Sequence, residues 1–386
     1  MQASPLYEVT LNSPRDLFCN TYILAGLHEL RHRGIVNLKY RFTDFEKYWP
    51  DPAIADPYYR EKWGPDDFIN TLELYTVKHL SSGRTSRVGF DMSDDPDMFV
   101  PALLKKCDLL FKRNYQSKYT DYLDPESRRK IRPFGLLYGV RSTHEQHESL
   151  LYLGKAAYDL SKLHYRGMTS RKGLRQHLIN PLGKLRYEFR RHRDTKTIPD
   201  YEQDCHDPTK PYLLFQTRTW IPRGTRKIDF DRINEQRASL IRKLRAAFGE
   251  RFVGGLIPDD YAREHFPDCL TASATDLRGY TNLIKQAAIV VYTQGLVDSP
   301  AWKLAEYLAA GKCIVAEPLA TELPKPLVND QDLVFYQSED DCVNQCARLL
   351  DDPASIERLA CNARAYYQAE VEPSAHILQI LQSAVR

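Results

Sequence analysis

The sequence lacks long hydrophobic runs and a strong net charge. No stretch approaches the roughly 18 apolar residues that a membrane-spanning helix needs. The residues from Met1 to Glu8 show no basic segment followed by an apolar run, so we expect no signal peptide. A net charge of +3 is too small to indicate a nucleic-acid-binding protein by itself. These absences favour a cytoplasmic protein and argue against nucleic acid as a partner.

The cysteines also lack a recognisable pairing pattern. None of the eight forms a Cys-x-x-Cys pair, and Cys342 and Cys346 have helical spacing rather than the spacing of a metal-binding loop. Cys107 and Cys313 lie within apolar runs, where a thiol behaves as a small hydrophobic side chain. The pattern favours a reducing compartment over a disulfide framework.

The remaining composition is that of an ordinary globular α/β protein. Apolar residues make up 42% and charged residues 27% of 386 residues, a length that exceeds the usual single core and predicts two domains. In the second half, short apolar strands alternate with helices, which predicts a parallel sheet covered on both faces. We expect a first domain over 1–150, a basic helical linker over 151–208, a second domain over 209–355 and a C-terminal helix over 356–386.

The periodicity predicts the individual elements. In the first half we expect strands at 6–11, 36–42, 72–78, 86–91, 108–113 and within 131–140, with helices at 21–33 and 99–106. In the second half we expect strands at 212–216, 251–256, 288–292 and 313–316, with helices at 233–248, 280–287, 300–310 and through most of 355–386.

The segment 295–317 is the most informative part of the sequence. Ser299 is suited to cap a helix, Pro300 to its first position and Gly311 to its left-handed end. The apolar stripe expected to face the sheet consists of Ala301, Leu304, Ala305 and Leu308.

This expected helix begins at the carboxyl end of a strand, where open α/β sheets bind ligands. Its free N–H groups would attract an anion such as a diphosphate. Lys303 could add a positive charge, and Glu306 could accept hydrogen bonds from sugar or ribose hydroxyls. From spacing alone, an ordinary surface helix explains the same pattern equally well.

The segment 298–315 resembles the nucleotide-sugar segment of the "group 1" glycosyltransferases of GT-B architecture. That family shows two acids separated by seven residues, then an Ala/Gly-rich turn and an apolar strand. Asp298 and Glu306 hold these positions, with Asp in place of the commoner Glu, which leaves a retaining or an inverting reaction open. The resemblance implies that Glu306 binds the donor ribose and that Asp298 touches the transferred sugar. The backbone amides that it implies around the diphosphate are those of Ser299, Ala301 and Trp302.

The family also places an Arg and a Lys after the first strand of the second domain, where they neutralise donor phosphates. Arg218 is the best match for the Arg, and Lys227 is the candidate for the Lys. A charged loop that is simply hydrated is the alternative interpretation.

Two predicted strand ends in the first half could form the opposite wall of a cleft. Asp94, with Asp91 in reserve, could act as the general base that deprotonates an acceptor hydroxyl. Capping of the next segment is the alternative interpretation of Asp94. Lys112 and Arg113 could bind an anionic acceptor or the donor phosphates, or could only carry charge from a strand end into solvent.

The tripeptide Asp95-Pro96-Asp97 resembles the metal-binding Asp-x-Asp of the other glycosyltransferase architecture. Such tripeptides are common by chance, and this one begins a helix. We therefore predict no metal site and no cofactor.

The segment 161–196 is strongly basic, with eleven Lys or Arg residues against two acids. It could attach the protein to an anionic membrane that carries lipid-linked acceptors. An RNA-binding stripe and a hydrated linker helix are the alternatives.

The resemblance implies two Rossmann-like domains that face each other across a cleft, with a last helix that crosses back to the first domain. The activity it implies is transfer of a sugar from a nucleotide sugar to a hydroxyl of a saccharide or lipid-linked glycan, as in polysaccharide biosynthesis. The alternatives are a nucleotide-sugar epimerase of the same fold and a non-catalytic protein that binds nucleotide sugars or polyanions.

Overall fold

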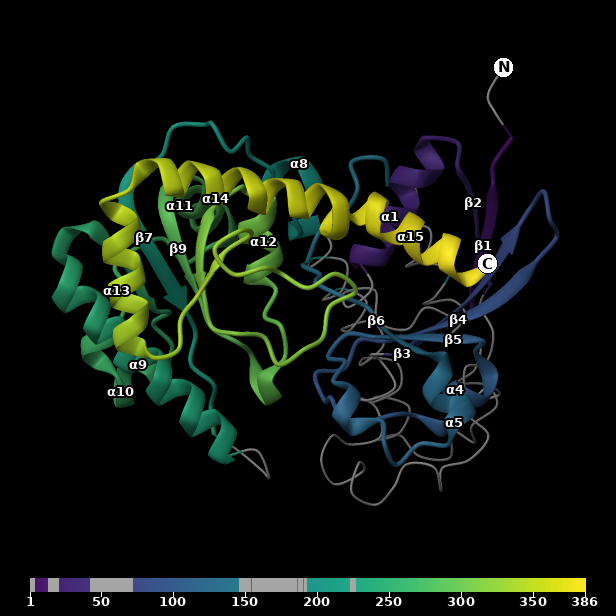
Figure 1. Cartoon of the computed structure of the whole chain (residues 1–386), viewed down its shortest axis with the longest axis horizontal. Helices are drawn as coiled ribbons and strands as arrows, with labels where there is room; N and C mark the ends of the chain where they lie inside the picture. The colour runs from purple at the N-terminus through teal and green to yellow at the C-terminus, as the bar shows by residue number, and fades with distance from the viewer. Residues whose placement is uncertain are drawn as a thin grey trace.

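The computed structural model describes residues 4–12, 21–41, 72–145, 193–222 and 227–386, together with the single positions 154, 186 and 190. Two sheets, one from each half of the chain, lie side by side, and the C-terminal helices pass over both (Figure 1). The predicted α/β fold with two Rossmann-like domains is confirmed.

The first sheet has six strands in the order β2-β1-β3-β4-β5-β6. Strand β3 is antiparallel to both of its neighbours, whereas the other pairs are parallel. A short turn around Gly83 joins β3 to β4, and a connection of that length can pair only antiparallel strands. The strands are β1 (Tyr7–Asn12), β2 (Val36–Arg41), β3 (Leu72–His79), β4 (Thr85–Asp91), β5 (Leu109–Lys112) and β6 (Ile131–Pro133).

Short helices accompany this sheet. They are α1 (Thr21–His32), α4 (Pro101–Lys106) and α5 (Pro125–Lys130), and the four-residue α8 (Ile198–Tyr201) precedes the second sheet.

The second sheet is wholly parallel, with five strands in the order β11-β10-β9-β7-β8. The first strand of this half, β7, lies between β8 and β9, so the strand order reverses between β7 and β9. Open α/β sheets bind ligands outside the carboxyl ends of the strands at such a point. The strands are β7 (Lys210–Thr217), β8 (Phe252–Leu256), β9 (Ala287–Tyr292), β10 (Cys313–Ala316) and β11 (Val334–Phe335).

Helices cover both faces of the second sheet, as the apolar strands predict. Ile289 and Val291 of β9 pack into one core with α9 and α13, whereas Val290 and Tyr292 pack into the other core with α11, α12 and α14. The helices are α9 (Lys227–Phe248), α10 (Asp260–His265), α11 (Leu277–Gln286), α12 (Lys303–Ala309), α13 (Glu339–Leu350) and α14 (Pro353–Tyr366).

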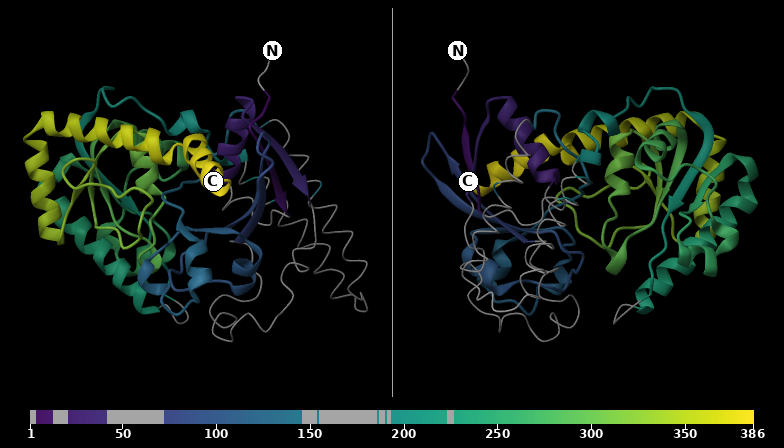
Figure 2. Two further views of the ribbon diagram at one scale, coloured as in Figure 1. Left: turned by 45° about the vertical axis from the view of Figure 1, so that its right-hand side comes forward. Right: turned by 180° about the vertical axis from the view of Figure 1, so that it is seen from behind.

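The last helix, α15 (Pro373–Ala384), crosses back to the first domain and packs on α1, as expected (Figures 1 and 2). Gly26 allows the close approach, since a Cβ there would overlap the carbonyl of Pro373. The hydroxyl of Tyr22 donates to the carbonyl of Val371, 2.6 Å away. These contacts tie the C-terminal end of the chain to the first domain.

A disulfide joins Cys205 to Cys361, which corrects the expectation of a chain without disulfides. The two residues are 156 positions apart, so no sequence spacing could reveal the pair. The other cysteines that the structure describes are buried thiols, as their apolar surroundings predict.

None of the described helices is long and apolar enough to cross a membrane. Most of the basic segment 161–196 lies outside the described residues. Its membrane, RNA and linker interpretations therefore stay open.

Candidate functional site

The turn between β9 and α12 differs from the sequence expectation. Ser299 does not cap the helix, because α12 begins at Lys303 and its N-cap residue is Trp302. The reason is a tight loop that precedes the helix, in which the amide of Gly295 donates to the carbonyl of Ser299 over 2.8 Å. Val297 in this loop has a positive φ of 48°.

Two of the three amides expected around a diphosphate already have partners. The amide of Ser299 donates to the carbonyl of Leu296, 3.0 Å away. The amide of Ala301 donates to the hydroxyl of Tyr292, 2.9 Å away. The site must therefore depend on side chains more than on the backbone of this turn.

Lys303 brings a positive charge to the point where the strand order reverses. Its ammonium group donates to the carbonyl of Gln216 at the end of β7 and lies 4.5 Å from the centre of the Tyr280 ring. Burial lowers the pKa of Lys303, and the charge of Glu306 partly opposes that shift. Because the ammonium has no carboxylate hydrogen-bonded to it among the described residues, its charge is available to an anion.

Glu306 lies one helical turn after Lys303 on α12. Its partly buried carboxylate makes no hydrogen bond to any residue that the structure describes. Burial raises the pKa of Glu306, while the positive charges of Lys303 and Lys196 lower it. A partly desolvated carboxylate with open acceptor sites is suited to bind hydroxyl groups.

Arg218 and Arg237 add two further positive charges at the same edge. Arg218 follows β7, and its guanidinium lies 4.0 Å from the centre of the Trp220 ring. Arg237 of α9 is buried, and it donates to the carbonyl of Arg218 over 2.7 Å and to that of Gln294 over 3.2 Å. Its Nε atom is buried and has no hydrogen-bond partner among the residues that the structure describes, and burial lowers the pKa of Arg237 to about 10. The charges of both arginines lower the pKa of Lys303, as expected for a compact cationic site.

The first domain contributes Arg113, which follows β5. One Nη atom lies 2.5 Å from a carboxylate oxygen of Asp94, and the other donates to the carbonyl of Pro300 over 2.9 Å. Asn114 reinforces the contact by donating to the carbonyls of Asp94 (2.7 Å) and Val297 (3.1 Å). The carboxyl end of β5 is thus bonded directly to the turn that precedes α12.

Asp94 faces the second domain as well. Its negative charge opposes the lowering of the pKa of Arg218 that burial causes. The Asp94 side chain keeps 31% of its surface exposed, so a ligand could reach it. The predicted residues Asp94, Arg113, Arg218, Lys303 and Glu306 therefore gather at the facing edges of the two domains.

A separate cavity of about 490 Å3 lies between α9 and the first turn of α13. Its lining includes the acids Glu317, Glu339 and Asp340 and one lysine, Lys243. This excess of negative charge is unfavourable for a diphosphate. The group of Lys303, Arg218 and Arg237, which we call the cationic edge, is therefore the better candidate for a diphosphate site.

Residues 237–382 match a protein-family model described as glycosyl transferase-like. This region of the chain is therefore similar to glycosyl transferases. The matched region includes Arg237, Asp298, Lys303 and Glu306, so most of the cationic edge lies within it. A comparison with curated proteins found no match.

Several solved structures are similar to the chain at low identity. The C-terminal domain of a group 1 family glycosyl transferase from Francisella tularensis is 14% identical, with a TM-score of 0.30, over 42% of this chain and 87% of that one. A putative UDP-N-acetylglucosamine 2-epimerase from Listeria monocytogenes is 12% identical, with a TM-score of 0.44, over 96% and 93%. Alr3699/HepE from Anabaena, solved with UDP, is 9% identical, with a TM-score of 0.40, over 97% and 98%. At these scores, the account of the site depends on the geometry above.

Within the glycosyl transferase-like region, Asp298 lies at the rim of the site. It has a positive φ of 55°, and its carboxylate is 2.9 Å from the guanidinium of Arg232. Almost half of the Asp298 side chain is exposed. Its predicted contact with the transferred sugar stays a prediction.

Asp91 and Lys112 lie in the interior rather than on a cleft wall. The Lys112 ammonium is 3.0 Å from a carboxylate oxygen of Asp91, and both side chains are fully buried. Asp91 also accepts hydrogen bonds from the amide and hydroxyl of Ser93. These contacts favour a structural role for the pair over the base and phosphate roles that the sequence suggested.

Trp302 and Lys227 complete the predicted set. The Trp302 ring packs on Gly139 of the first domain, where an added Cβ would lie 2.7 Å from the ring. Trp302 therefore contributes to the contact between the domains. The side chain of Lys227 lies outside the described residues.

Sequence reasoning missed Arg237, Gln216 and Asn114. Arg237 lies inside a long helix with many charged residues, so only its burial distinguishes it. Gln216 acts through its backbone carbonyl, and Asn114 acts through contacts with a segment more than 180 residues away. No local pattern carries that information.

Proposed function

We propose that the chain transfers a glycosyl group from a nucleotide sugar to an acceptor hydroxyl, with the donor diphosphate bound outside the carboxyl ends of β7 and β9. The observation that carries the proposal is the grouping of Lys303, Arg218 and Arg237 at this point, one helical turn from the open carboxylate of Glu306. The glycosyl transferase-like match of residues 237–382 supports it.

The cations provide the main catalytic effect in this proposal. Negative charge accumulates on the diphosphate as the bond to the sugar breaks, and preorganised positive groups stabilise it in the transition state. Lys303 and Arg218 have side chains that can reach the ligand, while Arg237 holds the strand ends in place. Protein cations would then take the role that a divalent metal has in other transferases.

Glu306 positions the nucleoside in this proposal. Its free acceptor sites fit the two hydroxyls of a ribose, and a hydrogen bond to a charged acceptor contributes about 1.5–3 kcal/mol. Asp298, at the rim, would contact the sugar that is transferred.

Asp94 is the proposed general base. One of its oxygens is held by Arg113, while the second makes no hydrogen bond to the described residues and can accept the proton of an acceptor hydroxyl. The acceptor, a saccharide or a lipid-linked glycan, would bind on the first domain. Closure of the two domains around both substrates would exclude water and limit hydrolysis of the donor.

A donor panel tests the proposal. UDP-, GDP-, CMP- and dTDP-sugars are titrated while thermal unfolding is followed, and nucleotide release is then measured with and without acceptor glycans. The proposal predicts stabilisation by one nucleotide class, about 2.7 kcal/mol at a hundredfold excess over Kd, and release that requires an acceptor.

The controls separate the alternatives. Turnover of the donor without any acceptor would indicate an epimerase, and binding without turnover would indicate a non-catalytic protein. Arg218→Ala should abolish the donor-induced stabilisation, whereas Arg251→Ala, at an exposed arginine outside the site, should leave it unchanged.

A further inference from the structure

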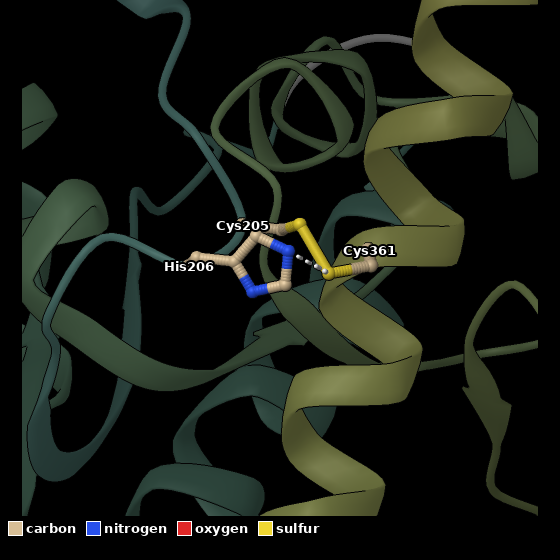
Figure 3. A group of neighbouring side chains, drawn as sticks. All are labelled: Cys205, His206 and Cys361. Atoms are coloured by element: carbon tan, nitrogen blue, oxygen red, sulfur yellow. Dashed lines mark hydrogen bonds between the residues drawn. A yellow bond between two sulfur atoms is a disulfide. The ribbon is translucent and has the colours of Figure 1, made fainter.

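A second group of reactive side chains lies away from the proposed donor site. Cys205 and His206 belong to the segment between α8 and β7, and Cys361 lies on α14. The two sulfurs are bonded, and the His206 ring lies beside them with Nε2 3.8 Å from the Cys361 sulfur (Figure 3). The ligand atoms of all three residues lie within 4.8 Å of one another.

The three side chains are ligands that Zn2+ prefers, two thiolates and one imidazole. In a tetrahedral site with Zn–S near 2.3 Å and Zn–N near 2.0–2.1 Å, a sulfur and a nitrogen ligand lie about 3.6 Å apart. The 3.8 Å between His206 and Cys361 is close to that value. Reduction would be needed first, because sulfurs in a disulfide are not thiolates.

A carboxylate already orients the imidazole. The Nδ1 atom of His206 is 2.9 Å from a carboxylate oxygen of Glu357, one turn before Cys361 on α14. Histidines that bind metals commonly donate their other ring N–H to a carboxylate, which directs the free nitrogen at the ion. Here that arrangement directs Nε2 at the sulfur of Cys361.

We propose that Cys205, His206 and Cys361 form a redox-gated Zn2+ site whose oxidised state is the disulfide seen in the structure. A dithiol passes two electrons and two protons to the disulfide, becomes a disulfide itself, and leaves two protein thiols. Zn2+ then displaces both thiol protons and binds the two sulfurs and Nε2 of His206, with water as the fourth ligand. Both cysteines are half-buried and His206 is exposed, so reductant and ion can reach them.

The site would hold the same two segments together in both states. The backbone N–H of Gln203 donates to the carbonyl of Ala309, 3.3 Å away, and Gly311 packs against Cys205. Arg364, one turn after Cys361, donates to the same carbonyl of Ala309 over 2.8 Å. The disulfide or the ion therefore lies against the C-terminal end of α12, the helix that carries Lys303 and Glu306.

Metal uptake by the full-length chain tests the proposal. Oxidised protein, and protein reduced with a phosphine and then desalted without oxygen, are titrated with Zn2+ against a chromophoric chelator. We expect one Zn2+ per reduced chain and none per oxidised chain. Reduction should lower the Tm, and Zn2+ should restore most of the loss. Co2+ in place of Zn2+ should give thiolate-to-cobalt absorption in the reduced protein only.

Variants separate the metal site from a simple structural disulfide. His206→Gln retains the disulfide, so the oxidised protein should keep the wild-type Tm, but its reduced form should bind Zn2+ at least about tenfold more weakly. Glu357→Gln should weaken binding by about 10–100-fold. Cys107→Ala, at a buried thiol in the first domain, is the matched control and should bind as the wild type does.

Two results would overturn the proposal. One is a reduced wild-type chain that takes up no Zn2+. The other is Zn2+ uptake that persists in the Cys205→Ser/Cys361→Ser double variant or is unchanged in His206→Gln, because the ion would then be held elsewhere.

Discussion

Each domain holds a lysine near a carboxylate at the end of a strand or the start of a helix, but the two lysines have different hydrogen-bond partners. In the first domain, Lys112 is fully buried and lies 3.0 Å from Asp91, which also accepts two hydrogen bonds from Ser93. In the second domain, Lys303 donates to a backbone carbonyl, and the carboxylate of Glu306 has no hydrogen bond to the described residues.

The difference teaches which charges serve the fold and which serve a ligand. In the buried ion pair of Lys112 and Asp91, each charge is compensated by the other, so neither group is available to a ligand. Lys303 and Glu306 make no hydrogen bond to each other, so part of the free energy of desolvating their charges is not compensated. The shifted pKa values of both residues reflect this cost. A ligand that supplies the missing partners recovers that cost on binding.

The comparison is tested most strongly at Asp94, which Arg113 holds through one carboxylate oxygen and whose second oxygen makes no hydrogen bond to the described residues. Asp94→Asn should reduce turnover by about 100- to 10,000-fold, the usual contribution of a general base, while donor affinity stays at the wild-type value. Steady-state kinetics with an acceptor, beside a donor titration, checks both. Retained turnover would remove Asp94 as the base.

Lys112 gives the second largest expected effect, on stability. Lys112→Met leaves the charge of Asp91 buried without its partner and should cost about 3–5 kcal/mol of unfolding free energy. Urea denaturation measures it. The double variant Asp91→Asn/Lys112→Met should recover much of the loss. If Lys112→Met alone lowers the unfolding free energy by less than about 1 kcal/mol, Lys112 and Asp91 do not compensate each other's buried charge as proposed.

Glu306 should show the opposite pattern. Glu306→Ala should weaken donor binding by about 1.5–3 kcal/mol, since it removes a charged acceptor of hydrogen bonds. The unfolding free energy of the variant should change little, because the substitution also removes the cost of desolvating the Glu306 carboxylate in the folded protein. Calorimetric titration with the donor measures the first and denaturation the second. Glu264→Ala, at an exposed glutamate on α10, is the control.

Lys303 should make the stability of the protein depend on pH. Because its pKa is lowered in the folded state, the unfolded chain binds more protons between that pKa and the ordinary lysine value of about 10.4. The contribution of Lys303 to stability therefore rises with pH across this window, by up to about 1.4 kcal/mol per pH unit, and is lost as the pH falls. Lys303→Met should remove that slope in denaturation series at several pH values. An unchanged slope would contradict the proposed environment of Lys303.

Asp298 should have the smallest effect on stability. Its ion pair with Arg232 is about half exposed, and such pairs contribute about 0–1 kcal/mol. Asp298→Asn should therefore unfold within about 1 kcal/mol of the wild type. A selective fall in turnover with unchanged nucleotide affinity would support its contact with the transferred sugar; equal turnover would exclude that contact.

Much of the fold could be predicted from the sequence because it follows from local patterns. The strand Cys313–Ala316 was expected with its observed bounds, and the helix Thr21–His32 was expected to within one residue. The helix after Ser299 was expected three residues too early, because the hydrogen bond between Gly295 and Ser299 overrides the capping preference.

The site could be predicted only in part, because its definition depends on contacts between distant residues. The glycosyltransferase-like segment identified Lys303 and Glu306. Asp91 is unavailable to a ligand because it is paired with Lys112, a contact that only the packing shows. The disulfide joins two residues that are 156 positions apart in the sequence. Neither leaves a mark in local spacing.

A crystal structure with a bound nucleoside diphosphate would test the central claim most directly. The account predicts phosphate oxygens within hydrogen-bonding distance of Lys303 and Arg218, and ribose hydroxyls on Glu306. A nucleotide bound instead in the acidic cavity between α9 and α13, with Lys303 still on the carbonyl of Gln216, would contradict it.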